Sequence, residues 1–200
     1  MVKIKLDPDA IKYLCYQRTQ YCEQVARLYT DELLKTYENI GAYLPSAAHR
    51  ILDVGAGLAG IDAFLYQHYA SPDIVLLDRN GIEDKSKIGY HKSAESFGAY
   101  NSFAAAEKLL IDAGVSPNRI TLHNIEFRPF PAGPFDLILS LLSWGFHYPL
   151  ATYAAAAMAA LSPQGKIIVD VRKGEDDKSL GKGRVIHTAE KFERKVFTKC

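Results

Sequence analysis

The sequence predicts an α/β fold in which helices cover both faces of a mostly parallel sheet. From residue 50 onward, short apolar runs that suit strands alternate with longer patterns that suit helices, and such alternation is typical of parallel sheets. The predicted strands are 50–54, 74–78, 119–124, 135–140 and 165–171, and the predicted helices are 58–70, 101–113 and 149–161. The alternation stops at 185–187 and 195–198, two apolar runs whose close spacing predicts an antiparallel hairpin.

The first ~45 residues are predicted to be helical from the spacing of their apolar residues. Asp7 can cap a helix that begins at Pro8, because its carboxylate accepts from unpaired N–H groups and proline suits the first helical position. A second helix, or a continuation of the first, is predicted from about residue 31 to 41–45. A chain of 200 residues suits one domain, in which we expect a helical cap, 1–48, and a core, 49–200.

Residues that favour helix ends support the predicted helices of the core. Asn101 is expected to cap the helix that follows it, and Gly114 is expected to end that helix. Pro149 is expected to begin the next helix, and Gly165 is expected just past its end.

The composition is that of a globular protein in water. Hydrophobic residues make up 48% of the chain and charged residues 24%, and both values are ordinary. The net charge of +1 argues against binding to nucleic-acid phosphates. No apolar run approaches the ~18 residues of a membrane span, and the charged start of the chain lacks the apolar core of a signal peptide. We therefore expect a cytoplasmic protein.

The cysteines do not predict a metal site. Cys15, Cys22 and Cys200 form no C-x-x-C pair. The first two are interpreted as small apolar residues on one face of a helix. No metal is therefore expected.

The most informative stretch is 51–60, where an apolar strand runs into a glycine turn and a helix follows. Gly55 and Gly57 allow the backbone to turn tightly and to approach a ligand, where a Cβ would collide. The helix that follows presents unpaired N–H groups at its start. The turn of Gly55, Ala56 and Gly57 is therefore predicted to hold a nucleotide-type cofactor.

Two cofactor classes compete for this turn, because residues 55–60 also satisfy the dinucleotide pattern G-x-G-x-x-G. In both classes a carboxylate at the end of the next strand accepts from the ribose hydroxyls, and Asp78 has that position. Asp53 favours one class, because a carboxylate beside the turn would repel a pyrophosphate but suits a cationic amino-acid group. An NAD(P)-dependent oxidoreductase remains the alternative enzyme.

The run 52–57 resembles the first motif of the class I S-adenosylmethionine-dependent methyltransferases, and 76–79 resembles their second. Residues 134–140 and 162–169 resemble the segments of their fourth and fifth strands, so the resemblance covers about 150 residues from Arg50 onward. It implies a three-layer, doubly wound sheet of seven strands in the order 3-2-1-4-5-7-6, with the last pair antiparallel. It also implies S-adenosyl-L-methionine as the cofactor and methyl transfer as the reaction.

The resemblance extends the set of expected cofactor contacts. Asn124 stands where the family often has an aspartate that meets the adenine amino group, and the next backbone N–H, that of Ile125, is expected to meet a ring nitrogen. Arg79 follows the ribose-binding position, and Ser140 ends the fourth strand, at the crevice where open α/β folds bind ligands.

The segment after the fourth strand combines the only tryptophan with a histidine and other aromatic residues. A hydroxyl that accepts a methyl group benefits from a base that removes its proton. His147 is the candidate catalytic base, because its ordinary pKa lies near neutrality. The alternative is a structural histidine. Trp144 and Phe146 are expected either to wall the cleft or to pack under the helix at 149–161.

Two further segments are candidates for substrate binding. In related small methyltransferases N-terminal helices lie over the site, which makes Tyr13, Tyr16 and Arg18 expected substrate contacts; the alternative is packing against the sheet. The segment 79–100 is long for a connection in a compact domain and could serve as a lid.

The acceptor is expected to be a small molecule, with a hydroxyl as the methylated group. No Asn/Asp-Pro-Pro-Tyr run follows the fourth strand and no cysteine lies near it, so neither amino methylation of DNA bases nor methylation at the C5 carbon of pyrimidines is expected. The run 142–149 is similar over a few residues to bacterial sugar O-methyltransferases. A binding protein that keeps the cofactor without catalysis remains the other alternative, and the sequence leaves the oligomeric state open.

Overall fold

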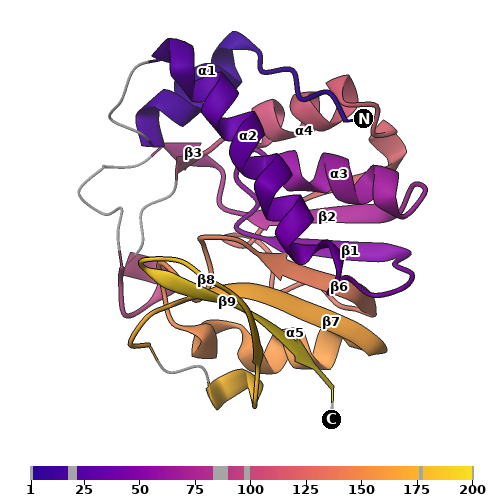
Figure 1. The fold of residues 1–200 in the computed structure, drawn as a ribbon, viewed down its shortest axis with the longest axis vertical. Coiled ribbons are helices and arrows are strands. Elements are labelled where there is room, and N and C mark those ends of the chain that lie inside the picture. Colours follow the sequence, from indigo (N-terminus) through magenta and orange to yellow (C-terminus); the bar gives the residue numbers. More distant parts are fainter. Residues whose placement is uncertain (1, 18–21, 83–89, 97–99, 176–177, 200) are drawn as a thin grey trace.

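A computed structural model describes residues 2–17, 22–82, 90–96, 100–175 and 178–199. Seven strands form one sheet in the order β5-β2-β1-β6-β7-β9-β8 (Figure 1). They are β1 Arg50–Val54, β2 Asp73–Asp78, β5 Ile120–Asn124, β6 Phe135–Ser140, β7 Leu161–Arg172, β8 Arg184–Thr188 and β9 Phe192–Thr198. The first five run parallel, whereas β9 is antiparallel to both β7 and β8. The predicted order and the antiparallel last pair are confirmed.

The central strands β1, β2 and β6 are buried along nearly their whole length because both faces of the sheet are covered. Leu52 and Val54 of β1 pack in a cluster with α5, Ala154–Ala160. Ile51, which points to the opposite face, packs in a cluster with α3, Gly60–His68. Alternate residues of one strand thus serve the two cores of the molecule.

Four helices gather on one side of the sheet and α5 lies on the other (Figure 1). The four are α1 Pro8–Gln17, α2 Cys22–Gly41, α3 and α4 Phe103–Asp112. Among the helices of the described residues, none has the length and apolar content that a membrane crossing requires. Helices on both faces confirm the predicted three layers.

The N-terminal helices pack on the core rather than standing apart from it. The Asp7 carboxylate accepts the N–H of Ala10 at 2.8 Å, and α1 begins at Pro8 as predicted. The second helix begins at Cys22 rather than near residue 31, because the apolar pattern before residue 31 belongs to two helices. Val25 of α2 is buried in one cluster with residues of α1 and α4, so the cap shares the hydrophobic core of the sheet.

The predicted cap at Asn101 is wrong by one residue. Ser102 is the N-cap of α4, and its hydroxyl accepts the N–H of Ala105 at 3.3 Å. Asn101 instead belongs to the short strand β4, Tyr100–Asn101, which pairs with β3, Gly81–Ile82. This pairing joins the two ends of the long segment 79–100. Residues 83–89 and 97–99 lie outside the described residues, so a lid function stays a prediction.

The helix expected at 149–161 is shorter than predicted. Pro149 precedes a 3-10 turn, Leu150–Thr152, and α5 begins at Ala154. Strand β7 begins directly after α5, because Leu161 already pairs with Phe135 of β6. Gly165 therefore lies inside a strand.

Candidate functional site

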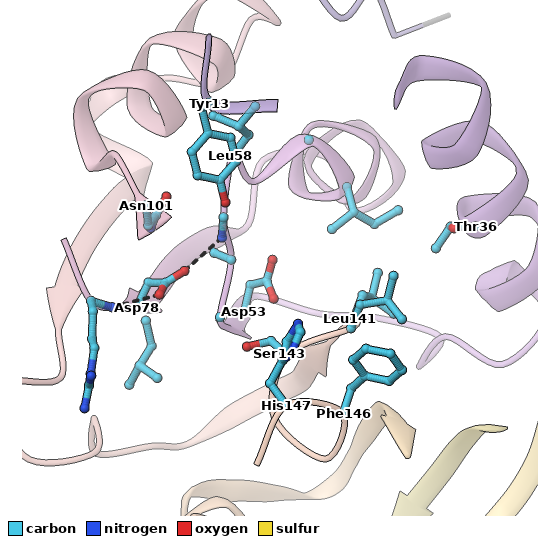
Figure 2. A pocket seen from close by; sticks show the side chains of 18 of the residues that line it. Tyr13, Thr36, Asp53, Leu58, Asp78, Asn101, Leu141, Ser143, Phe146 and His147 are labelled. Carbon is cyan, nitrogen blue, oxygen red and sulfur yellow. Dashed lines mark hydrogen bonds between the residues drawn. The ribbon is translucent and has the colours of Figure 1, made fainter. Parts of the chain in front are cut away.

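A pocket of about 470 Å³ opens at the carboxyl ends of β1, β2 and β6. Most of its wall comes from the glycine turn after β1, the end of β2, the loop after β6 and the helices α1 and α2 (Figure 2). Most of the residues predicted for the site line this pocket; they are Asp53, Gly55, Ala56, Gly57, Asp78, Arg79, Ile125 and His147. Asn124 and Ser140 do not line it.

The glycine turn has the geometry that the sequence predicts. Gly55 and Gly57 have φ angles of +75° and +56°, which L side chains rarely adopt. A Cβ at Gly55 would collide with the side chain of Ser143 in the loop after β6. A Cβ at Gly57 would lie 3.0 Å from the hydroxyl of Tyr13. The two glycines therefore let the turn, the loop and α1 meet at the pocket.

Asp78 holds this turn in place from the neighbouring strand. The N–H of Gly57 donates to Asp78 Oδ2 at 3.0 Å, and the N–H of Arg79 donates to Asp78 Oδ1 at 2.8 Å (Figure 2). Burial raises the pKa of Asp78 to about 6, although these two hydrogen bonds and the Arg79 charge lower it. Each carboxylate oxygen can accept more than one hydrogen bond, so the side chain can still accept from a pair of hydroxyls.

Asp53 faces the pocket and has a second carboxyl behind it. Asp62, in the first turn of α3, lies within hydrogen-bonding reach of Asp53, and both side chains are buried. Burial, together with the charges of Asp62 and Asp78, raises the pKa of Asp53 well above its usual value. Burial also raises the pKa of Asp62, to about 7. The sequence analysis missed Asp62, although an acidic residue within the apolar run 58–65 was a signal.

Ser140 ties the loop after β6 to strand β1 through two hydrogen bonds within the protein. The Ser140 hydroxyl donates to the Val54 carbonyl at 2.7 Å and accepts the N–H of Trp144 at 3.0 Å. Because both partners are buried backbone groups of the protein, the expectation that Ser140 contacts the cofactor is corrected. Trp144 is also buried, its indole N–H donates to the Leu150 carbonyl at 2.9 Å, and it packs under the turn before α5 instead of walling the cleft.

His147 and Phe146 reach the pocket from the same loop (Figure 2). The backbone of His147 is fixed on both sides: its N–H donates to the Ser143 carbonyl at 2.7 Å, and its carbonyl accepts the N–H of His91 at 2.7 Å. Figure 2 shows the imidazole beside Ser143, on the side of the pocket where Asp53 lies. A fixed backbone and a ring turned toward the pocket suit a residue that meets a ligand.

The two polar groups expected to meet an adenine edge already have hydrogen-bond partners within the protein. The amide oxygen of Asn124 accepts the N–H of Glu126 at 2.9 Å, in the local turn that asparagine favours after a strand. The N–H of Ile125 donates to the Asp78 carbonyl at 3.1 Å and extends the pairing of β2 with β5. Ile125 reaches the pocket, but the two polar groups expected to read the base have partners within the protein.

The N-terminal helices contribute one wall of the pocket. Tyr13 of α1 is buried and lines the pocket, and its contact with a substrate stays a prediction. The hydroxyl of Tyr29, on α2, accepts the N–H of Gly60 at 3.2 Å and so joins this wall to the start of α3. Glu32, Leu33 and Thr36 of α2 also line the pocket and were not singled out from the sequence. The side chain of Tyr16 and the whole of Arg18 lie outside the described residues.

Arg194 of β9 is a further pocket residue that the sequence analysis missed. Its Nε and Nη2 donate to the two carboxylate oxygens of Asp170 on β7, at 2.7 and 3.0 Å, and both side chains are buried. Asp170 also accepts the N–H of Leu142, in the loop after β6, at 3.2 Å. This ion pair therefore connects two strands with the loop that carries His147. The described residues contain no cluster of three or more metal-ligating side chains.

The sequence matches no protein-family profile and no curated protein, but the fold matches solved structures. A candidate O-methyltransferase from Nostoc punctiforme superimposes with a TM-score of 0.59 at 12% identity, over 84% of this chain and 56% of that one. A methyltransferase from Pyrococcus furiosus gives 0.53 at 13% identity, over 82% and 81%. A candidate methyltransferase from Pseudomonas syringae gives 0.53 at 17% identity, over 86% and 99%. The chain thus spans about half the length of the Nostoc protein.

At these identities the likeness concerns the fold alone. That fold is shared with solved methyltransferases, and its strand order and antiparallel last pair are those that the sequence resemblance implies. The resemblance found in the sequence motifs is therefore confirmed at the level of architecture.

Proposed function

We propose that the protein is an S-adenosyl-L-methionine-dependent methyltransferase that methylates a small molecule at a hydroxyl oxygen. The observation that carries the proposal is the placement of Asp53 and Asp78 at the ends of adjacent strands, in one pocket, on either side of a glycine turn. The pocket volume of about 470 Å³ lies within the usual range for small-molecule sites.

The residues present suit the cofactor at both of its polar groups. Asp78 can accept from ribose hydroxyls, because each of its oxygens has capacity beyond the backbone bond that it already receives. Asp53 can face the cationic amino-acid group, and Leu77 and Ile125 offer apolar surface beside Asp78 for the base. When bound, the cofactor supplies a methyl group on a positively charged sulfur. Asp53, whose strongest neighbouring charges are those of Asp62 and Asp78, favours such a ligand over a pyrophosphate.

The other end of the pocket suits a hydroxylated acceptor. Leu141 and Phe146 provide apolar walls, Thr36 provides a hydroxyl, and Arg194 provides a guanidinium that Asp170 holds in one orientation. His147 lies between this end and Asp53 (Figure 2). With cofactor and acceptor bound, His147 would hold the acceptor hydroxyl and take its proton, and the cofactor would supply the methyl group that replaces it.

The NAD(P)-dependent oxidoreductase is disfavoured by the same carboxyls. A pyrophosphate seated on the turn after β1 would lie beside Asp53 and Asp78, and Asp62 adds a third acid in the same region. Like charges in a buried site repel strongly. The third hypothesis is a protein that binds the cofactor without catalysis. It requires the same pocket and differs only in predicting no turnover.

Calorimetric titration tests the cofactor class. We expect S-adenosylhomocysteine and S-adenosylmethionine to bind and NAD⁺ to give no measurable heat of binding. Tight NAD⁺ binding with no binding of either methionine derivative would overturn the proposal. Catalysis is then tested by the transfer of a labelled methyl group to a panel of small molecules that carry hydroxyl or amino groups. Labelled product from the amines alone would show that the acceptor atom is nitrogen and not oxygen.

A further inference from the structure

Asp62 is a buried carboxyl that the proposed reaction does not yet use. Its side chain is fully buried in α3, between apolar residues that pack into the core, and neither of its oxygens has a hydrogen-bond partner among the described residues. An ionised carboxylate in such a place costs several kcal/mol unless something compensates it. Burying a leucine or an asparagine at this position would cost less free energy, so the presence of a carboxyl here suggests a function.

The side chain that faces Asp62 is that of Asp53. The two carboxyls lie within hydrogen-bonding reach of each other. Asp53 opens to the pocket, whereas Asp62 does not line it and lies behind Asp53. Two buried carboxyls at this separation cannot both ionise without strong repulsion, so they share one proton near neutral pH.

The other charged or titratable groups of the pocket are spread over its wall. They are Tyr13 on α1, Tyr29 and Glu32 on α2, Asp78 and Arg79 at the end of β2, His147 and Tyr148 after β6, Tyr153 before α5 and Arg194 on β9. The neighbouring charges that act most on Asp53 are those of Asp62 and Asp78, and both are negative. Arg194 gives two of its nitrogens to Asp170. The pair of Asp53 and Asp62 is thus an acidic site prepared for a cation from outside the protein.

We propose that Asp62 is the second carboxyl of an ammonium site: in the cofactor-free protein it shares a proton with Asp53, and the ammonium group of the bound cofactor displaces that proton into solvent. The inference rests on the proposed function, because the ammonium is that of the cofactor's amino-acid group. No covalent bond changes. The pair goes from one negative charge to two as the proton leaves, and the ammonium adds one positive charge beside Asp53. Asp62 acts through Asp53 and is a positioning residue.

The exchange gives the site a means of selecting its ligand. A cation within ~4–6 Å of a carboxyl lowers its pKa by about 1–3 units, which is enough to ionise a carboxyl that is half protonated at neutral pH. A nucleoside without the amino-acid group fills the ribose and base positions but leaves the proton in place. The pair therefore favours the complete cofactor over truncated nucleosides, and this preference grows as the pH rises.

Calorimetry with two ligands tests the exchange directly. S-adenosylhomocysteine and 5′-methylthioadenosine are titrated at pH 7 in two buffers that differ in ionisation enthalpy, so that the heat difference counts the protons released. We expect about half a proton to one proton for S-adenosylhomocysteine and close to none for 5′-methylthioadenosine. The second ligand is the control for Asp78, because both ligands carry the ribose.

The variant Asp62→Asn keeps the shape of the side chain and removes the titratable group. In the wild type the affinity for S-adenosylhomocysteine should rise between pH 6 and pH 8, by up to about tenfold per unit, and in the variant this rise and the proton release should largely disappear. Equal proton release with both ligands overturns the inference, as does an unchanged pH profile in Asp62→Asn. The two-ligand comparison needs no variant, so it decides even if Asp62→Asn fails to fold. If neither ligand binds at all, the methyltransferase proposal itself fails, which is a different result.

Discussion

The two ends of the pocket are built in different ways. The cofactor end comes from β1, β2 and the turn between β1 and α3, and its polar groups are fixed by backbone bonds such as the one from Gly57 to Asp78 at 3.0 Å. The acceptor end comes from α2, the loop after β6 and β9, and is joined by side chains, with the ion pair of Asp170 and Arg194 at its centre. A backbone frame suits a constant ligand, whereas side chains on separate elements can be exchanged to suit a particular acceptor.

The largest expected effect is at the acceptor end. His147→Ala should lower turnover by about 10²–10⁴-fold, the usual contribution of a general base, and should leave the affinity for S-adenosylhomocysteine nearly unchanged. His147→Asn, which keeps a hydrogen-bonding group but takes no proton near neutrality, should be almost as slow. Turnover is measured together with the melting temperature. Near-normal turnover of His147→Asn with a lower melting temperature in His147→Ala would make this histidine structural.

The next effect belongs to the cofactor end. Asp78→Ala should weaken S-adenosylhomocysteine binding by at least about tenfold, since hydrogen bonds to a charged group contribute about 1.5–3 kcal/mol each. Asp73→Ala is the matched control, because Asp73 lies at the other end of the same strand, where its half-exposed carboxylate forms an ion pair with Arg119. Calorimetric titration with S-adenosylhomocysteine measures the affinity of both variants and of the wild type. Equal affinities of the wild type and Asp78→Ala would remove the ribose assignment.

The variant Ser140→Ala tests whether this serine has a structural role or a role in cofactor binding. Ser140→Ala loses the bonds to the Val54 carbonyl and the Trp144 N–H, and leaving buried backbone groups unpaired costs about 1–3 kcal/mol each. We expect a lower free energy of unfolding in urea and less than about a threefold change in cofactor affinity. A large loss of affinity at full stability would restore Ser140 to the cofactor site.

The smallest expected effect is a gain of stability in the cofactor-free protein. The pKa of Asp62 is raised to about 7 in the folded state from a value of 3.8, so between these pH values the folded protein holds a proton that the unfolded chain has lost. The free energy of unfolding should therefore fall as the pH rises from about 4 to about 7. Asp62→Asn removes this loss and should be more stable than the wild type by ~1 kcal/mol at pH 8, since one pKa unit corresponds to about 1.4 kcal/mol and the buried amide cancels part of the gain.

Urea unfolding at pH 5 and pH 8 measures this difference. The advantage of Asp62→Asn should be present at pH 8 and much smaller at pH 5. A variant that is less stable than the wild type at both pH values would show that the carboxyl of Asp62 stabilises the fold.

The same contrast explains what could be predicted from the sequence. The glycine turn and the positions of Asp53 and Asp78 follow from local patterns, because each consists of neighbouring residues on one strand and its turn. The strand order is not local, and it was predicted from the resemblance to a methyltransferase family. Arg194 could not be found in this way, since its role depends on the register that sets it opposite Asp170, and that register is known only once β7 and β9 pair.

Polar residues near strand ends were the main source of error. Asn124 and Ser140 stand at the expected positions, but neither lines the pocket, and each bonds to a backbone group of the protein. Asp62 was missed for the opposite reason. A charged residue in a helix is usually exposed, and only the packing of α3 against β1 reveals that this one is buried beside Asp53.

A crystal structure of the complex with S-adenosylhomocysteine tests the central claim most directly. The account predicts that the ribose hydroxyls donate to the Asp78 carboxylate, that the ammonium group lies beside Asp53, and that the sulfur points toward His147. The account would be contradicted by a ligand whose amino-acid group lies away from Asp53, or by a pocket that binds the ligand only between α2 and β9.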